Sequence, residues 1–423
     1  MTKSTFLLTL VFLFAAFAQV NAQSYKYPLF EHFTQASCGP CATQNPSFQA
    51  TILEPNPNSV RHIAYHTSWP GFDPMYNANT TQSADRVNFY GVSGVPDIFL
   101  QGNFKEAQPG GMTMSDVNSI VSQTSPVKIT VQDVDNGTSH DVNVTIRSVG
   151  TPPAGTWNLV NVVIERNVNY ANPPGNNGEK YFPNVMRKIV PSSNGVAVTL
   201  PALGSESTFS YTYDEDAAWN MDEIGVVSFL QNSPSKEILN AGSSFDEVQN
   251  ALLTPPVTTA KDGLNGVATS FDFNTGNGGN TDEDFIFTLT SDAPADWSAS
   301  FTVNGTTASL ATIIMTANSS LAGTIDVTPG PAPAFATYSL SIAPANNPNA
   351  PAMLTQVYVI SGVTDLIVNN AAGNGVTPGD AATWQAGFVN GLNAAGSTTY
   401  DVVYHTAAQN AFSQGAMVGV KHL

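Results

Sequence analysis

The pattern of apolar and polar positions divides the chain into regions of different periodicity. Between residues 25 and 125, apolar runs of strand length alternate with segments that suit helices. The expected strands are 27–34, 60–66 and part of 91–102, and the expected helices are 42–53, 79–90 and 114–123. Pro46 should kink the first of these helices or mark its first turn. The alternation predicts a mixed α/β domain over residues 25–125.

From residue 126 onward the apolar positions recur with a period of two. Strand-like segments lie at 127–134, 141–146, 157–166, 196–200, 207–213 and 224–231, separated by loops rich in proline, glycine and asparagine. This spacing predicts an antiparallel, immunoglobulin-like β-sandwich over residues 126–250. The long segment 167–184 interrupts the strands, and loops of that size are functional in some proteins and poorly ordered in others.

The remaining sequence predicts a linker, a second sandwich and a short α/β unit. Residues 251–266, with Pro255 and Pro256, are typical of a linker. Five alternating segments between 285 and 342 predict a second β-sandwich over residues 267–362. Residues 363–423 follow a strand, helix, strand, helix order, which normally extends into a larger parallel sheet. This unit is therefore expected to be truncated or to pack against a partner, and His405 and His422 within it have no recognisable nucleophile partner.

The N-terminus and the composition indicate an exported protein. Lys3, an apolar run over 6–17 and a small residue at Ala22 predict a signal peptide, 1–22, with no cysteine at the cut. No later apolar run reaches the length of a membrane-spanning helix. A net charge of −18 argues against nucleic acid and anionic membrane surfaces as partners. The expected location is the periplasm, the outer membrane surface or the extracellular space.

Both cysteines of the chain lie in one motif, Cys38-Gly39-Pro40-Cys41, at the expected start of a helix. Ser37 is the expected helix cap. Free amides and the dipole at a helix N-terminus stabilise a thiolate, so such a pair can alternate between dithiol and disulfide. In an oxidising compartment the pair rests as a disulfide. A loop this short removes little unfolded-state entropy, which favours redox chemistry over a structural bridge.

The motif together with residues 91–102 (GVSGVPDIFLQG) resembles thioredoxin-like domains. The resemblance implies that Cys38 and Cys41 are the catalytic pair and that the Val95–Pro96 bond is cis. It also implies that Pro96 shapes the peptide groove and keeps metal away, and that the Val95 backbone pairs with a substrate beside Gly39 and Pro40.

This sequence departs from the thioredoxin pattern at two positions. Ser37 stands where thioredoxins usually carry tryptophan. The position of the buried acid, six residues before the first cysteine, is His32, with Glu31 beside it. Either side chain could accept a proton from Cys41, and the alternative is that it faces solvent or satisfies a local hydrogen bond.

A second resemblance covers about residues 25–250. Its motifs are the aromatic strand leading into C-x-x-C at 30–41, G-V-x-G-x-P at 91–96, I-E-R-N-V at 164–168 and S-F-L-Q-N-S-P-S-K-E-I-L at 228–239. In this order they resemble the twenty-eight-kilodalton outer-membrane protein family of bacteria. The resemblance implies an envelope-associated protein in which a thioredoxin-like domain is fused to an immunoglobulin-like one.

Two functions remain open from the sequence. The first is a thiol–disulfide oxidoreductase that acts on protein or peptide thiols and disulfides. The alternative is a non-enzymatic surface binding or adhesion protein, in which Cys38–Cys41 is a structural disulfide on a thioredoxin-like scaffold. No cofactor is expected. A metal site is not expected either, because His62 and His66 share a strand face without a cysteine or acid at ligand spacing.

Overall fold

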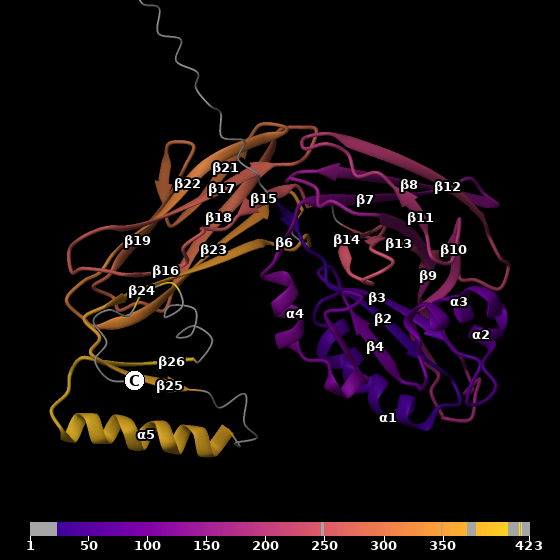
Figure 1. Ribbon diagram of the computed structural model, residues 1–423, viewed down its shortest axis with the longest axis horizontal. Coiled ribbons are helices and arrows are strands. Elements are labelled where there is room, and N and C mark those ends of the chain that lie inside the picture. Colours follow the sequence, from indigo (N-terminus) through magenta and orange to yellow (C-terminus); the bar gives the residue numbers. More distant parts are fainter. Residues whose placement is uncertain are drawn as a thin grey trace, which may run out of the picture.

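The computed structural model describes residues 23–246, 249–347, 349–369, 378–404, 414 and 416 (Figure 1). The predicted signal peptide, His405 and His422 lie outside these residues. None of the helices in the described residues combines the length and the hydrophobicity needed to cross a membrane.

The N-terminal unit is a mixed α/β structure, as the sequence predicts. Its strands are β1 (Ser24–Tyr25), β2 (Leu29–Thr34), β3 (Arg61–His66), β4 (Asp97–Leu100), β5 (Lys105–Ala107) and β6 (Thr124–Ser125). Its helices are α1 (Gly39–Phe48), α2 (Pro74–Ala78), α3 (Thr80–Tyr90) and α4 (Met114–Val121). Pro46 lies inside α1, and the chain continues from α1 as a π-helix, Gln49–Leu53. The β2 and β3 strands are parallel, and β4 runs antiparallel to β2.

One sheet runs from this unit into the next one. Its strand order is β14-β13-β9-β10-β3-β2-β4-β5, with β11 beside β9. The added strands are β9 (Trp157–Asn169), β10 (Tyr181–Val190), β11 (Val196–Val198), β13 (Ile224–Gln231) and β14 (Ile238–Ser243). The joint is the parallel pairing of β10 with β3 at Val185 and Ala64. The boundary expected at residues 125 and 126 therefore does not separate two sheets.

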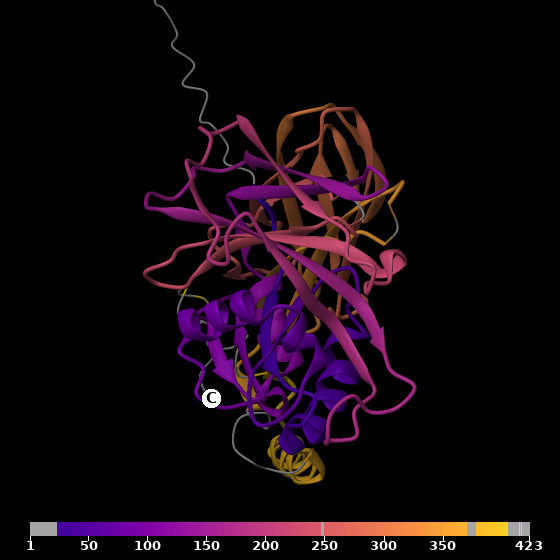
Figure 2. The same cartoon turned by 90° about the vertical axis from the view of Figure 1, so that its right-hand side faces the viewer.

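A three-stranded sheet, β12-β8-β7, completes the first sandwich. Its strands are β7 (Val127–Asp135), β8 (Ser139–Ser148) and β12 (Glu206–Asp214). Burial alternates residue by residue along β8, so that Val142, Val144 and Ile146 pack on residues of the shared sheet such as Val163 and Val226. Figure 2 shows these strands above the indigo N-terminal helices.

The second sandwich consists of two five-stranded sheets, β15-β17-β22-β19-β20 and β16-β24-β23-β18-β21. Their strands are β15 (Ala251–Thr254), β16 (Ala260–Asp262), β17 (Thr269–Asn277), β18 (Glu283–Ser291), β19 (Ser298–Val303), β20 (Thr306–Ala308), β21 (Leu310–Met315), β22 (Ser319–Thr328), β23 (Ala334–Pro344) and β24 (Met353–Ser361). Five fully buried phenylalanines, Phe271, Phe273, Phe285, Phe287 and Phe301, fill its core. The linker prediction for 251–266 is wrong, because β15 and β16 in this range pair with β17 and β24.

The C-terminal part contains the predicted strand, helix and strand. These are β25 (Asp365–Asn369), α5 (Pro378–Ala394) and β26 (Tyr400–Tyr404). The two strands pair in parallel from Asp365↔Tyr400 to Asn369↔Tyr404. They lie beneath the second sandwich in Figure 1, and Asp401 accepts a hydrogen bond from the Phe335 amide at 2.6 Å.

Candidate functional site

Helix α1 begins directly after Cys38, and Cys38 and Cys41 form a disulfide. Cys38 is the helix cap, because its Sγ accepts a hydrogen bond from the Cys41 amide at 3.1 Å. The prediction of Ser37 as the cap is wrong, since the Ser37 hydroxyl donates instead to the Phe72 carbonyl oxygen at 2.8 Å. Cys38 Sγ therefore lies at the positive end of α1, where a thiolate is stabilised.

The segment before β4 approaches the same sulfur. The Val95–Pro96 bond is cis, as the thioredoxin resemblance implies. Cys38 Sγ lies 3.5 Å from the Val95 carbonyl oxygen. Gly39 and Pro40 are exposed at the surface, whereas Pro96 is buried. The fold thus brings together the cysteine pair and the Val95–Pro96 segment, which are far apart in the sequence.

Both cysteines are covered in this structure. Cys38 is 2% exposed and Cys41 is 0% exposed. A reagent that attacks Cys38 Sγ must therefore approach past the neighbouring segments, or those segments must move. This burial is a property that the sequence motif does not reveal.

The loop 170–180, which joins β9 to β10 and lies within the long segment noted in the sequence, contacts the backbone at Cys38. The Asn177 side-chain amide donates to the Cys38 carbonyl oxygen at 3.0 Å, and the Asn177 backbone amide donates to the Ala36 carbonyl oxygen at 3.3 Å. At Gly175 an added Cβ would lie 2.1 Å from the Ala36 carbonyl oxygen, so only glycine permits this approach. The sandwich therefore supports the backbone that carries Cys38.

Asp73 holds the turn before Cys38 from the other direction. Its carboxylate accepts hydrogen bonds from the Ala36 amide at 2.7 Å and from the Met75 amide at 2.8 Å, and it pairs with His66 Nδ1 at 2.7 Å. Burial alone would raise the pKa of Asp73, but His66 and the backbone donors outweigh it and lower the pKa. Sequence reasoning missed Asp73 and Asn177, because neither belongs to a local motif.

Glu31 is fully buried in a polar network on one face of β2. Its carboxylate pairs with Arg86 and accepts hydrogen bonds from the hydroxyl groups of Tyr90 and Tyr65, the latter at 3.0 Å. Arg86 also donates to Gln231 of β13 at 3.1 Å. These contacts give Glu31 a structural task that joins the N-terminal unit to the sandwich, and its proton-acceptor role stays a prediction.

His32 lies on the opposite face of β2, towards α1. Its Nδ1 is 3.2 Å from Nε2 of His62, and both rings contact Phe48. Burial lowers the pKa of His32, and the nearby His62 and His66 lower it further. Burial lowers the pKa of His62 to about 3, so both rings are neutral at physiological pH.

A cavity of about 230 Å³ lies between these histidines and helix α1. His32, His66, Asn45 and Glu179 are among its lining residues. Three buried atoms, His32 Nε2, His66 Nε2 and Asn45 Oδ1, have no hydrogen-bond partner among the described residues. The cavity can therefore hold water or a small polar molecule beside the helix that carries Cys41.

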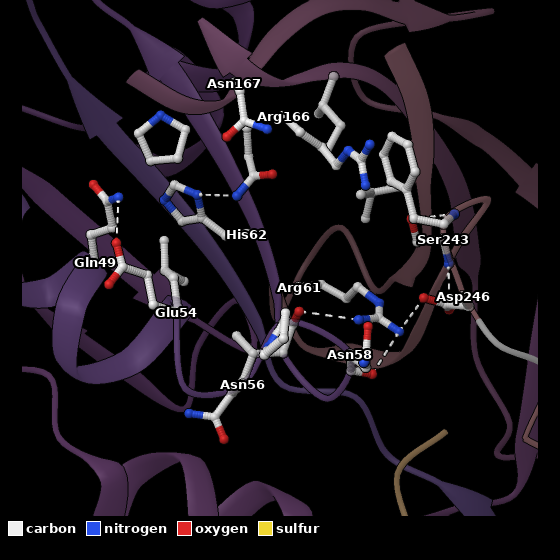
Figure 3. A pocket seen from close by; sticks show the side chains of 18 of the residues that line it. Gln49, Glu54, Asn56, Asn58, Arg61, His62, Arg166, Asn167, Ser243 and Asp246 are labelled. Carbon is white, nitrogen blue, oxygen red and sulfur yellow. Dashed lines mark hydrogen bonds and ion pairs between the residues drawn. The ribbon is translucent and has the colours of Figure 1, made fainter. Parts of the chain in front are cut away.

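A second cavity, of about 260 Å³, lies where the π-helix and β3 meet β9 and β14 (Figure 3). His62 lines both cavities and forms a 3.2 Å contact with Asn184. Arg61 on its wall pairs with Asp246, and Arg166 pairs with Glu223 at 3.3 Å. Because both arginines already have carboxylate partners, this cavity is a weaker candidate for an anion site than its lining alone indicates.

The fold and the cysteine pair define the class of protein: a mixed α/β unit with a disulfide at a helix N-terminus, joined to β-sandwiches. Residues 84–247 match the family model described as outer membrane protein Omp28, so this part of the chain is an Omp28 family domain. The family resemblance and the predicted location in the bacterial envelope are both confirmed by this match. No curated protein matches the chain.

Among solved structures, HBP35 of Porphyromonas gingivalis is similar at 14% identity and a TM-score of 0.42, over 80% of this chain and 98% of that one. A domain of the outer membrane lipoprotein Omp28 from the same organism has 14% identity and a TM-score of 0.22, over 28% of this chain and 86% of that one. Red sea bream transglutaminase has 10% identity and a TM-score of 0.22, over 64% of this chain and 38% of that one.

Proposed function

We propose that the Cys38–Cys41 pair is a thiol–disulfide exchange site on a thioredoxin-like unit of an envelope protein, and that its substrates are protein or peptide thiols and disulfides. One observation carries the proposal. Cys38 Sγ accepts the Cys41 amide at the start of α1 and also lies 3.5 Å from the Val95 carbonyl oxygen. A sulfur at a helix N-terminus beside the backbone of the Val95–Pro96 segment is suited to attack on a bound peptide.

The exchange moves two electrons between the protein and its substrate. The reduced Cys38 thiolate attacks one sulfur of a substrate disulfide, so that a mixed disulfide forms and the other substrate sulfur leaves as a thiolate. Cys41 then loses its proton and attacks Cys38 Sγ, which releases the second substrate thiolate and restores the Cys38–Cys41 disulfide. The substrate gains two electrons and two protons, one proton from Cys41 and one from solvent, which had taken up the Cys38 proton when the thiolate formed. An external dithiol must reduce the protein again. The reverse sequence oxidises a substrate dithiol.

The surface at Gly39 and Pro40 gives the substrate its route to the pair. Both residues are exposed, while Val95 is half-buried and Pro96 is buried. We assign Val95 the task of pairing its backbone with an extended peptide, and Pro96 the task of shaping the groove. The two sandwiches, in the immunoglobulin-like arrangement expected from the sequence, would dock or present this unit.

The burial of Cys38 favours a second candidate function. A sulfur on a residue that is 2% exposed, with a backbone that Asn177 holds in place, suits a structural disulfide on a binding or adhesion scaffold. In that case the thioredoxin-like unit supports a surface protein and performs no exchange.

The reduction potential of the pair tests the proposal. The mature chain is equilibrated in glutathione or dithiothreitol buffers, and the two thiols are counted by alkylation and mass spectrometry. A potential of roughly −120 to −270 mV, with alkylation at Cys38 faster than at Cys41, supports exchange. A potential below about −300 mV would overturn it in favour of a structural bridge.

A trapping variant adds a direct readout of the mechanism. Cys41→Ser cannot resolve the mixed disulfide, so it should accumulate a covalent adduct with a model peptide disulfide. Cys38→Ser is the matched control, because it retains one thiol but loses the attacking sulfur. Equal adduct formation by the two variants would contradict the assigned roles.

A further inference from the structure

A group of metal-ligating side chains lies at one end of the three-stranded sheet, among residues that the cysteine site does not include. Asp135 ends β7, His140 lies opposite it in β8, and Glu215 directly follows β12. One ligand atom from each of these three residues lies within 4.8 Å of the other two. The hairpin between β7 and β8 and the end of β12 thus converge on one point.

His140 is aimed into this group. The residue is 7% exposed, and its Nδ1 lies 3.0 Å from Asp133 Oδ1. That contact occupies Nδ1, so Nε2 is the ring nitrogen that faces Glu215. Nε2 is buried and has no hydrogen-bond partner among the described residues, and Glu215 Oε1 lies 3.3 Å from it.

The surroundings fix the His140 ring in this orientation. The Tyr213 hydroxyl donates to Asp133 Oδ2 at 2.8 Å, and the Tyr213 ring stacks on His140 with centroids 4.9 Å apart. A carboxylate that holds one nitrogen of a histidine while the other nitrogen remains free is the usual arrangement around a metal ligand. Asp133 and Tyr213 therefore act as positioning residues.

We propose that Asp135, His140 and Glu215 bind one divalent transition-metal ion of the zinc type. One imidazole and two carboxylates form a donor set for such an ion, and water completes the coordination. The 3.3 Å between His140 Nε2 and Glu215 Oε1 is close to the edge of a zinc tetrahedron, about 3.4 Å for bonds of about 2.0–2.1 Å. Asp135 is exposed, so the ion can enter from solvent.

The ion would tie the β7–β8 hairpin to the chain after β12. These segments are already paired, as Asp135↔His140 and His140↔Tyr213. Because the three ligands come from three segments, they are together only in the folded protein, and the metal should stabilise the native state. This site differs in ligands and location from the cysteine pair.

The test uses the full chain, with the Cys38–Cys41 disulfide intact so that no thiol competes for metal. Co²⁺ is titrated while its absorption spectrum is recorded, and Zn²⁺ is titrated by calorimetry. The expected result is one equivalent bound by the wild type. His140→Gln should abolish this binding, and Glu215→Gln should weaken it at least tenfold.

Glu206→Gln is the matched control. Glu206 lies on β12, where it pairs with Arg147 at 3.7 Å, and its substitution removes the same charge without touching the ligands. It should bind metal as the wild type does. The proposal is overturned if the wild type shows no saturable one-to-one binding at millimolar Co²⁺, or if Glu215→Gln binds as tightly as Glu206→Gln. If His140→Gln does not fold, Glu215→Gln and Asp135→Asn decide the outcome.

Discussion

The Asn177 side-chain amide donates a hydrogen bond to the carbonyl oxygen of Cys38 at 3.0 Å, although the two residues are 139 positions apart in the chain. Asn177 belongs to the loop between β9 and β10, whereas Cys38 caps the helix of the N-terminal unit. The same amide reaches the Gln35 carbonyl oxygen at 3.3 Å. The backbone that carries the Cys38 sulfur is therefore held by the sandwich, and we expect the rate of thiol exchange at this sulfur to depend on the loop.

The first prediction concerns this contact. Asn177→Ala removes the donor to Cys38 and Gln35, so the free energy of unfolding should fall by about 1–2 kcal/mol. The loop should also cover the pair less tightly, and dithiothreitol should reduce the disulfide several-fold faster. Alkylation of the free thiols in samples quenched at successive times measures this rate, and urea unfolding measures the stability.

Asn103→Ala is the matched control for this prediction. The Asn103 side chain donates to the Ser235 carbonyl oxygen at 2.9 Å, which is the same type of contact at a different place. It should lower the stability by less, because this contact is exposed, and it should leave the reduction rate unchanged. Equal reduction rates in the two variants would show that the loop does not control access.

The second prediction concerns Asp97, which follows Pro96. Burial, and then the charge of Glu106, raise the pKa of this carboxyl to about 6. An acid whose folded pKa is above its unfolded value of about 3.9 binds its proton more tightly in the folded state, so it stabilises the fold at low pH and loses this effect as the pH rises through 6.

As the pH rises from 5 to 7.5, the free energy of unfolding of the wild type should therefore fall relative to that of Asp97→Asn. Because Asp97 is partly exposed, we expect a difference on the order of 1 kcal/mol. Urea unfolding of both proteins at the two pH values measures it. Parallel pH dependences for wild type and Asp97→Asn would contradict the prediction.

The third prediction concerns the buried pair of Arg86 and Glu31. Arg86→Met leaves the Glu31 carboxylate buried without its cation and should cost about 3–5 kcal/mol of stability. Lys105→Met is the control, since Lys105 pairs with Asp116 at 2.7 Å near the surface and should cost less than about 1 kcal/mol. Similar losses in both variants, measured by urea unfolding, would argue against a buried ion pair.

The sequence predicts those elements of this structure whose secondary structure depends on a short-range pattern of residues. β7 and β8 can be predicted because buried and more exposed residues alternate along them. The cysteine motif can be recognised because its two cysteines are close together in the sequence. β10 cannot be predicted from the local pattern, because Pro183, Arg187 and Lys188 lie within it and its partner β3 is distant in the sequence. A loop was therefore expected over the first residues of β10.

The candidate site shows the same division between local and distant determinants. Cys38, Cys41, Val95 and Pro96 were predicted and are brought together, since motif and resemblance both mark them. The contacts that hold the backbone at Cys38 were not predicted, because Asp73 binds the Ala36 amide and Asn177 binds the Cys38 carbonyl oxygen only through the tertiary fold. Ser37 was expected to cap α1, but the Cys38 sulfur takes that position one residue later.

The last prediction follows from the shared sheet. β3 pairs with β10, Arg86 donates to Gln231 of β13, and the Tyr27 amide donates to Asn240 of β14 at 3.0 Å. Separating the N-terminal unit from the sandwich would break these buried contacts, so the two should open together as one cooperative unit. In native-state hydrogen exchange of the full chain, amides of β3 and β13 should reach the same opening free energy as denaturant is added. Amides of β18 and β23, in the second sandwich, serve as the comparison because their sheet is separate. Exchange of β3 at lower denaturant than β13 would mean that the N-terminal unit opens by itself, and that the sheet joint contributes little to its stability.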